Sequence, residues 1–201
     1  MNVTTLESLR VLYNPARERS IKKQIAYLDR HCQRVISLSP FLVLGTCSAA
    51  MQMDTSPRGG AGGFVKVLDE HTLLIPDAPG NNRLDSLENI IATGRVGLLF
   101  LVPGVDETLR VNGSAVLSTD EREIELCADE KRRPKLAIKI TVAEAYLHCA
   151  KALMRSKLWS DEYRVDRSTL PSMGEMTRDQ IGGDVPAETQ EEMLKRYAAD
   201  L

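Results

Sequence analysis

The chain has 201 residues and a net charge of −2, from 26 Lys and Arg against 28 Asp and Glu. Hydrophobic residues make up 43% and charged residues 27%, a composition typical of a soluble globular protein with one domain and its appendages. This balance offers no basic excess for a nucleic-acid backbone, and aromatic residues, at 4%, are too few for the stacking platforms of single-strand binders.

Targeting segments and a disulfide framework are not indicated either. The first residues lack the basic start and apolar core of a secretory signal, and the longest apolar stretch, 96–102, is far shorter than the roughly 20 residues of a membrane helix. The four cysteines stand far apart without a CxxC pair, which argues against a zinc site. We therefore expect a cytoplasmic protein with reduced thiols, no metal and no membrane partner.

Residues 1–40 are predicted to form a helical segment that packs on the domain after it. Asn14-Pro15 is typical of a helix start. Apolar residues then recur at helical spacing from Ile21 to Ile36, while basic residues occupy the other face.

Residues 41–160 are predicted to form a small β-rich domain. Alternation and short apolar runs indicate strands over 41–46, 51–56, 64–68, 72–75, 96–102, 108–117 and 136–142. Helices are expected near 82–92 and 120–129. Because mostly short turns join the strands, we expect an antiparallel sheet that closes into a barrel and not a doubly wound fold.

Residues 161–201 are predicted to form a polar tail. Turn-forming residues are frequent from Pro171 onward, and a terminal helix over 187–199 has only a thin apolar stripe. Whether this tail packs on its own domain or on a partner is left open by the sequence.

Common catalytic motifs are absent from the sequence. There is no GxSxG, HExxH or GxxxxGK[ST]. The glycine run 59–63 precedes a predicted strand and not a helix, so it is no dinucleotide fingerprint. The histidines are scattered, without metal-ligand spacing.

Three stretches are candidate anion sites, and the first runs from Asp54 to Gly59. Ser56 and Arg58 place a hydroxyl and a guanidinium near the end of a strand, and Arg binds phosphate through two parallel hydrogen bonds. A plain surface turn is the alternative.

The second stretch, 76–87, is a rigid turn that leads into a helix whose first turn carries Asn82 and Arg83. A helix N-terminus attracts anions and disfavours cations, so Arg83 makes more sense beside a bound anion. The alternative is that Asn81 or Asn82 simply caps the helix. Both explanations can hold together.

The third stretch is 150–159. If it is helical, Lys151, Arg155 and Trp159 are spaced i, i+4 and i+8 and share a face. Two cations aligned with the only Trp suggest an anionic aromatic ligand; the alternative is a solvated basic face with Trp159 as a core anchor. Taken together, the three stretches fit a phosphorylated planar cofactor such as FMN.

The segments FLVLGTCSA, MDTSPRGG, LLIPDAPGNNRLDSLENI, RVGLLFLVPGVDETLRVNG and HCAKALMRSKLW, taken in combination, carry a resemblance. Over residues 20–175 the chain resembles the pyridoxamine 5′-phosphate oxidase-like family of FMN-binding split barrels, and within it a bacterial FMN-dependent subgroup. The resemblance implies a six-stranded antiparallel split barrel that forms a homodimer with FMN at the interface.

The resemblance also implies where the cofactor lies. The phosphate would contact Arg58 and Asn82-Arg83, and the positions that match family contacts near the flavin are Pro76-Asp77 and Thr108, all of which differ from the family's residues. The C-terminal substrate-binding segment of the true oxidase is not found, so pyridoxamine phosphate oxidation is not expected. Segment 151–159 belongs to the subgroup and is placed beside the cofactor, with the dimer mate as an alternative source.

We therefore expect an FMN-dependent oxidoreductase acting on a small molecule, with two alternatives. One is a non-catalytic protein that binds flavin or haem, and the other is a barrel kept for protein interaction. The expected cofactor-binding residues are Ser56, Arg58, Pro76, Asp77, Asn82, Arg83, Thr108, Lys151, Arg155, Ser156 and Trp159. No catalytic acid or base is assigned. The central expectation is that Arg58 and Arg83 converge on one phosphate.

Overall fold

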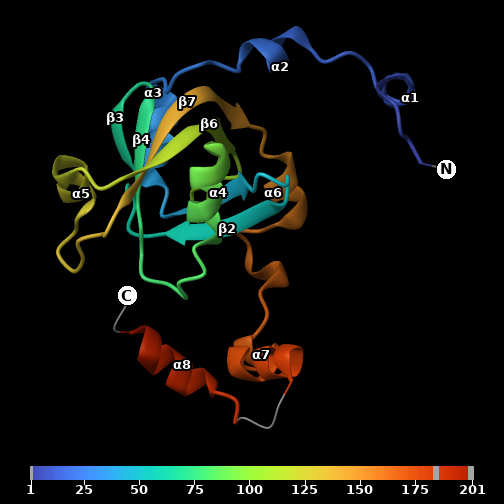
Figure 1. Ribbon diagram of the computed structural model, residues 1–201. Helices are drawn as coiled ribbons and strands as arrows, with labels where there is room; N and C mark the ends of the chain where they lie inside the picture. Colours follow the sequence, from blue (N-terminus) through green and yellow to red (C-terminus); the bar gives the residue numbers. More distant parts are fainter. Residues whose placement is uncertain (1, 183–185, 199–201) are drawn as a thin grey trace. The chain divides into compact units, whose positions relative to one another are not determined.

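The computed structural model describes residues 2–182 and 186–198. The chain forms two compact units that divide between Trp159 and Ser160, and each is described by itself (Figure 1). No helix among the described residues is long and apolar enough to cross a membrane.

The first unit is built on one antiparallel sheet of seven strands in the order β2-β1-β5-β6-β7-β4-β3. The strands are β1 Phe41–Cys47, β2 Met53–Gly59, β3 Lys66–Asp69, β4 Thr72–Pro76, β5 Arg95–Leu101, β6 Thr108–Ser118 and β7 Ala137–His148. The mainly β, antiparallel prediction is confirmed, and the seven strands agree with the seven patterns in the sequence, whereas the six-stranded sheet implied by the family resemblance is wrong. Since β2 and β3 stand at the two ends of this order, closure into a barrel stays a prediction.

The helices are α1 Leu6–Val11, α2 Glu18–Lys22, α3 Arg30–Leu38, α4 Asp85–Thr93, α5 Glu121–Cys127, α6 Lys151–Ser156, α7 Met173–Ile181 and α8 Gln190–Tyr197, with 3₁₀ turns at Asp161–Tyr163 and Arg167–Thr169. Helices α3, α4 and α5 contact this sheet, and α7 and α8 belong to the second unit. Figure 1 shows α4 beside β2, and contacts join α4 to β1, β2, β5 and β6.

The predicted continuous helix before Pro40 is wrong, because the chain changes conformation between α2 and α3. Ile25 forms a β-bridge with Ala145, in which its backbone N–H donates to the Ala145 carbonyl at 3.0 Å. The Asp29 carboxylate then caps α3 by accepting the N–H groups of His31 and Cys32, and these bonds lower the pKa of Asp29. The helical periodicity therefore predicted the buried face of α3 correctly, but it wrongly extended this helix back through Ile25.

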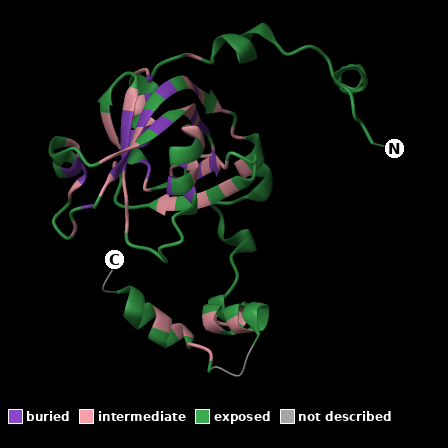
Figure 2. Cartoon of the chain, viewed as in Figure 1, coloured by how far each residue is buried: buried purple, intermediate pink, exposed green. Residues whose placement is uncertain are grey.

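A single hydrophobic core joins the sheet to helices α3 and α4. Alternate residues of β1 and β5 point inward, among them Leu44 and the fully buried Phe100. Ile36 on α3 and Ile90 on α4 belong to the same cluster. Figure 2 shows that most of the buried, purple segments lie on the strands of the sheet. Ile91, the next residue of α4, points away from this core, with an exposed fraction of 76%.

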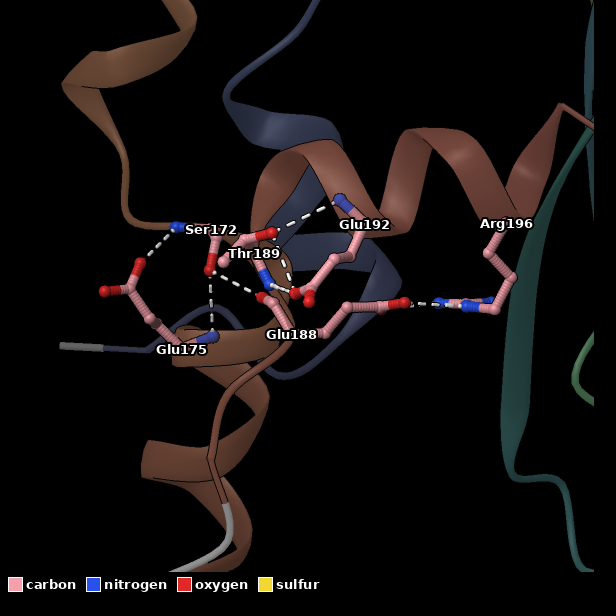
Figure 3. A network of polar contacts seen from close by, with 6 residues as sticks. All are labelled: Ser172, Glu175, Glu188, Thr189, Glu192 and Arg196. Atoms are coloured by element: carbon pink, nitrogen blue, oxygen red, sulfur yellow. Dashed lines mark hydrogen bonds and ion pairs between the residues drawn. The ribbon is translucent and has the colours of Figure 1, made fainter.

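The second unit is a helical hairpin held by polar contacts. Among its described residues none is buried. Ser172 and Thr189 start α7 and α8 with capping boxes, and the Ser172 hydroxyl also donates to the Glu188 carbonyl oxygen at 3.2 Å (Figure 3). The Glu188 carboxylate pairs with Arg196 and raises the pKa of that guanidinium. The predicted terminal helix is confirmed as α8, although residue 199 lies outside the described residues.

We predict that Gly113→Ala destabilises the fold. A β-bulge between Asn112 and Gly113 brings Gly113 against β7, where an added Cβ would overlap the backbone carbonyl oxygen of Thr141. Overpacking against rigid backbone costs about 1–3 kcal/mol, so urea denaturation should show a lower free energy of unfolding. Gly45→Ala is the control, because its Cβ would lie 3.6 Å from the Gly97 carbonyl oxygen, an ordinary contact. Equal losses in both variants would contradict the prediction.

Candidate functional site

Strand β2 has two different faces. Its residues alternate in exposure, and those on the less exposed face are Asp54, Ser56 and Arg58, whereas Met53, Thr55, Pro57 and Gly59 are exposed. Successive side chains of a strand point to opposite sides, so the three polar residues share one face. This face is the one turned toward helix α4, because Asp54 forms a hydrogen bond with Ser86 of that helix.

A polar network joins Asp54 to α4. The Ser86 hydroxyl, on the first turn of α4, donates to Asp54 Oδ2 at 2.6 Å. Asn89 Nδ2, one turn further along α4, donates to the Thr46 hydroxyl at 3.0 Å, and Thr46 donates to Asp54 Oδ2 at 3.4 Å. Ser86 and Thr46 are buried, so water is largely excluded from these bonds. The network fixes α4 against β1 and β2.

Arg58 lies on the same face, four residues along β2. Its Nε atom is buried and has no hydrogen-bond partner among the described residues. A buried donor without an acceptor costs free energy, and the cost is larger for a charged group. This unpartnered donor is the feature of β2 that an external acceptor would satisfy, and contact between Arg58 and a cofactor stays a prediction.

Arg83 precedes α4 and does not belong to its first turn, which corrects the sequence interpretation. Its guanidinium is exposed, and Nε donates to Asp85 Oδ2 at 2.8 Å. This hydrogen bond and the charge of Asp85 raise the pKa of Arg83, with a further contribution from the charge of Asp54. A carboxylate of the protein therefore already lies beside Arg83, and the charge of Asp54 acts on the same guanidinium; convergence of Arg58 and Arg83 on one phosphate stays a prediction.

The N-terminus of α4 is not capped by the residues that the sequence suggested. Neither Asn81 nor Asn82 caps the helix; Asn81 Oδ1 accepts the backbone N–H of Arg83 at 3.1 Å. The N-cap is Leu84, which has no side-chain cap, and both Asn82 and Leu84 have positive φ, 58° and 60°. A branched apolar residue in this region is strained, and such strain is concentrated at functional sites.

The remaining positions near the expected flavin ring lie at strand ends. Pro76 ends β4 opposite Ala137, and the Asp77 N–H donates to the Leu136 carbonyl oxygen at 3.0 Å. Thr108 begins β6 and is buried. Their contact with a cofactor stays a prediction.

The third predicted stretch is only partly helical. Helix α6 contains Lys151, Arg155 and Ser156 but stops there, because Lys157 is left-handed with φ 49°. Trp159 therefore does not continue the helical face of Lys151 and Arg155, and that prediction is wrong. Instead, Trp159 Nε1 donates to the Val105 carbonyl oxygen at 3.0 Å and fixes the segment to the β5–β6 loop. The Ser156 hydroxyl donates to the Leu153 carbonyl oxygen of its own helix.

Two surface hollows contain none of the predicted cofactor-binding residues. One, of about 540 Å³, lies between α3 and β3. The other, of about 320 Å³, lies on the sheet face that carries Gly45 and Gly97, where Asn112 Nδ2 donates to Glu144 Oε1 at 2.5 Å. Sequence reasoning missed both; paired glycines on neighbouring strands were the available signal for the second, because glycine leaves space above a sheet.

Comparison with known families gives one match, to the family model described as pyridoxamine 5′-phosphate oxidase, over residues 28–149. The matched range is more than half of the chain and contains the whole seven-stranded sheet. The chain belongs to the pyridoxamine 5′-phosphate oxidase family. The predicted resemblance is therefore confirmed, and β2, α4 and their network lie inside the matched range.

Solved structures similar to this member of the pyridoxamine 5′-phosphate oxidase family match it at low identity. HupZ from Group A Streptococcus is 16% identical with a TM-score of 0.50, covering 59% of this chain and 92% of HupZ. An FMN-binding protein from Syntrophomonas wolfei is 12% identical with a TM-score of 0.44, covering 72% of this chain and 97% of that protein. No curated protein matches the sequence.

We predict that Ser86→Ala destabilises this family member by about 1–3 kcal/mol, because Asp54 loses its shortest hydrogen bond in a partly buried setting. Urea denaturation followed by circular dichroism measures the free energy of unfolding. Ser37→Ala is the matched control: its hydroxyl is exposed and donates only to a carbonyl of its own helix, so a change within about 0.5 kcal/mol is expected. A Ser86 variant as stable as the Ser37 variant would contradict the role of the network.

Proposed function

We propose that the protein is an FMN-binding oxidoreductase whose cofactor phosphate is held at strand β2. The observation that carries the proposal is the buried Nε of Arg58, which has no partner within the described residues, in a chain of this family. A phosphate oxygen is the acceptor that a guanidinium binds best, through short charge-assisted hydrogen bonds.

The residues around Arg58 fit a phosphate in part. Ser56 shares its face of β2 and offers a hydroxyl donor. The N-terminus of α4 contributes less, because Asp85 and Glu88 already place negative charge in its first turn. We therefore assign the phosphate to Ser56 and Arg58, with Arg83 as a second cation that first has to leave Asp85.

Bound flavin would supply hydride or electron transfer. The chain's own part is to bind and orient it. The Asp54–Ser86 hydrogen bond fixes the strand face that carries Arg58. Lys151 and Arg155, both exposed on α6, are the cations proposed to support negative charge on a reduced ring. No protein acid or base is assigned, and a non-catalytic flavin carrier is the outcome expected if bound flavin accepts no electrons from a donor.

The visible spectrum of the purified protein tests this proposal, together with the FMN affinity of variants. We expect a flavin spectrum, reduction by NADH or NADPH, and an Arg58→Ala variant that binds FMN more weakly by about 1.5–3 kcal/mol, the value of a charged hydrogen bond. Arg83→Ala should weaken binding less, because Asp85 already neutralises that guanidinium. Arg122→Ala, exposed on α5, is the control.

Three results would contradict the proposal. They are a colourless protein that does not bind added FMN, a Soret band in place of flavin absorption, and an Arg58→Ala variant with the FMN affinity of the Arg122→Ala control.

We also propose that the functional form is a homodimer. Val43 pairs with Leu99, and Phe41 with Leu101, on the face of β1 and β5 that points away from the core. These four apolar side chains form a partly exposed patch, and Phe41 keeps 38% of its surface exposed in the single chain. Contiguous apolar surface of this kind is typical of protein interfaces.

Light scattering after gel filtration tests the dimer. Leu99→Glu places a charge in the centre of the patch, so we expect the mass of a dimer for the wild-type protein and of a monomer for the variant. Val116→Glu, at an exposed position of β6, should remain dimeric. A monomeric wild-type protein, or a Leu99→Glu variant that stays dimeric, would refute this assignment.

A further inference from the structure

The groove between α3 and β3 is separate from every residue assigned to the flavin. One wall is the α3 face that carries Arg30 and Arg34, and the other is β3 with Lys66. Leu126 of α5 closes one side. The volume, about 540 Å³, lies within the usual range of small-molecule sites, roughly 300–1,000 Å³.

Two backbone hydrogen bonds fix how the segment 63–70, which contains β3, runs relative to α3. Near the end of α3, the Gly63 N–H donates to the Ser39 carbonyl oxygen at 3.4 Å. Near its start, the Leu28 N–H donates to the Glu70 carbonyl oxygen at 2.7 Å. The chain from 63 to 70 therefore runs antiparallel to α3, which brings Lys66, midway along it, level with the middle of the helix where Arg34 lies.

Three cationic side chains, Arg30, Arg34 and Lys66, line this groove, and no carboxylate among its lining residues balances their charge. Arg30 Nε contacts His31 Nε2 at 3.3 Å and Lys66 Nζ donates to the Gly63 carbonyl oxygen at 3.2 Å. Within the described part of the chain, neither of them nor Arg34 forms an ion pair, and no Asp or Glu lines the groove. Asp29, the acid nearest in sequence, is engaged in capping α3.

This arrangement has a local cost. Like charges four residues apart on a helix repel each other, and Arg30 also stands in the first turn, where a cation opposes the helix dipole. An anion between Arg30, Arg34 and Lys66 would remove both penalties. The positions of these charges thus favour an anionic ligand over a neutral or cationic one.

The residues at the floor of the groove indicate the chemistry of the uncharged part of the ligand. It is aliphatic, with the buried Ile36 and Val65 and the half-buried Val67, and Leu126 adds a side chain that is 54% exposed. No aromatic residue lines it, so a planar ring would find no stacking partner. A flexible aliphatic chain, in contrast, gains free energy from apolar contact alone.

We propose that this groove binds a small amphipathic anion, with an aliphatic chain on the Ile36–Leu126 floor and a single carboxylate or phosphate head between Arg30, Arg34 and Lys66. The proposal goes beyond the proposed function, since it concerns a second ligand at a second site.

Calorimetric titration of the full chain tests the site with three probes below their micelle concentrations: dodecanoate, dodecyl phosphate and dodecanol. We expect saturable one-to-one binding of at least one anion and none of the neutral alcohol. Arg34→Glu should weaken that binding at least about tenfold, the loss expected for one charge-assisted hydrogen bond, and Leu126→Ser should weaken it as well. Arg122→Glu, an exposed arginine of α5 outside the groove, should bind like the wild-type protein.

Comparison of dodecanoate with dodecyl phosphate identifies the head group. The proposal is overturned if neither anion binds the wild-type chain, if the alcohol binds equally well, or if Arg34→Glu and Arg122→Glu behave alike. These substitutions lie on the protein surface, and bound FMN, followed by its absorption, should not be displaced by the probes. Loss of flavin binding and loss of anion binding are therefore separate results.

Discussion

The hydrogen bond that Ser86 donates to Asp54 joins helix α4 to strand β2, and the candidate site depends on this contact. Together with Thr46 and Asn89 it fixes the helix over one face of the strand. Arg58 lies on that same face, where its Nε is shielded from water without gaining an acceptor. We propose that the network preorganises this strand face for an anion at Arg58, because the cost of ordering the strand is then met during folding and not during binding.

At Arg83 the sequence correctly predicted a neighbouring anion, but the structure shows a protein carboxylate in that position. A cation near the start of α4 does need a neighbouring anion, and Asp85 supplies it two residues away. The charge of Asp54 also acts on Arg83, so two carboxylates influence this guanidinium. The Nε of Arg58, in contrast, has no hydrogen-bond partner among the described residues, and we therefore propose Arg58 and not Arg83 as the main phosphate contact.

Much of the fold could be predicted from the sequence because alternation is a strong signal: in β6 the buried Val111 lies on the face that the pattern placed inward. The apolar runs of β1 and β5 predicted the strands but not that every second residue, such as Phe41, is partly exposed. The break between α2 and α3 could not, since the bridge from Ile25 to Ala145 is a long-range contact without a local signal. Likewise, the left-handed Lys157 ends α6 before Trp159 although nothing in the local pattern requires it. The sequence also pointed to Ser56 and Arg58 on β2. It could not predict that Arg58 Nε is buried without a partner, or that a groove lies beside α3, because both depend on packing between distant segments.

The most direct measurement of the central claim is the ¹H–¹⁵N resonance of Arg58 Nε, followed by NMR while FMN is added. Formation of a hydrogen bond from the buried, unpartnered Nε–H to phosphate should shift this resonance more than those of the other arginines and protect it from exchange with water. An Arg58 Nε signal that stays unchanged while flavin binds would contradict the account.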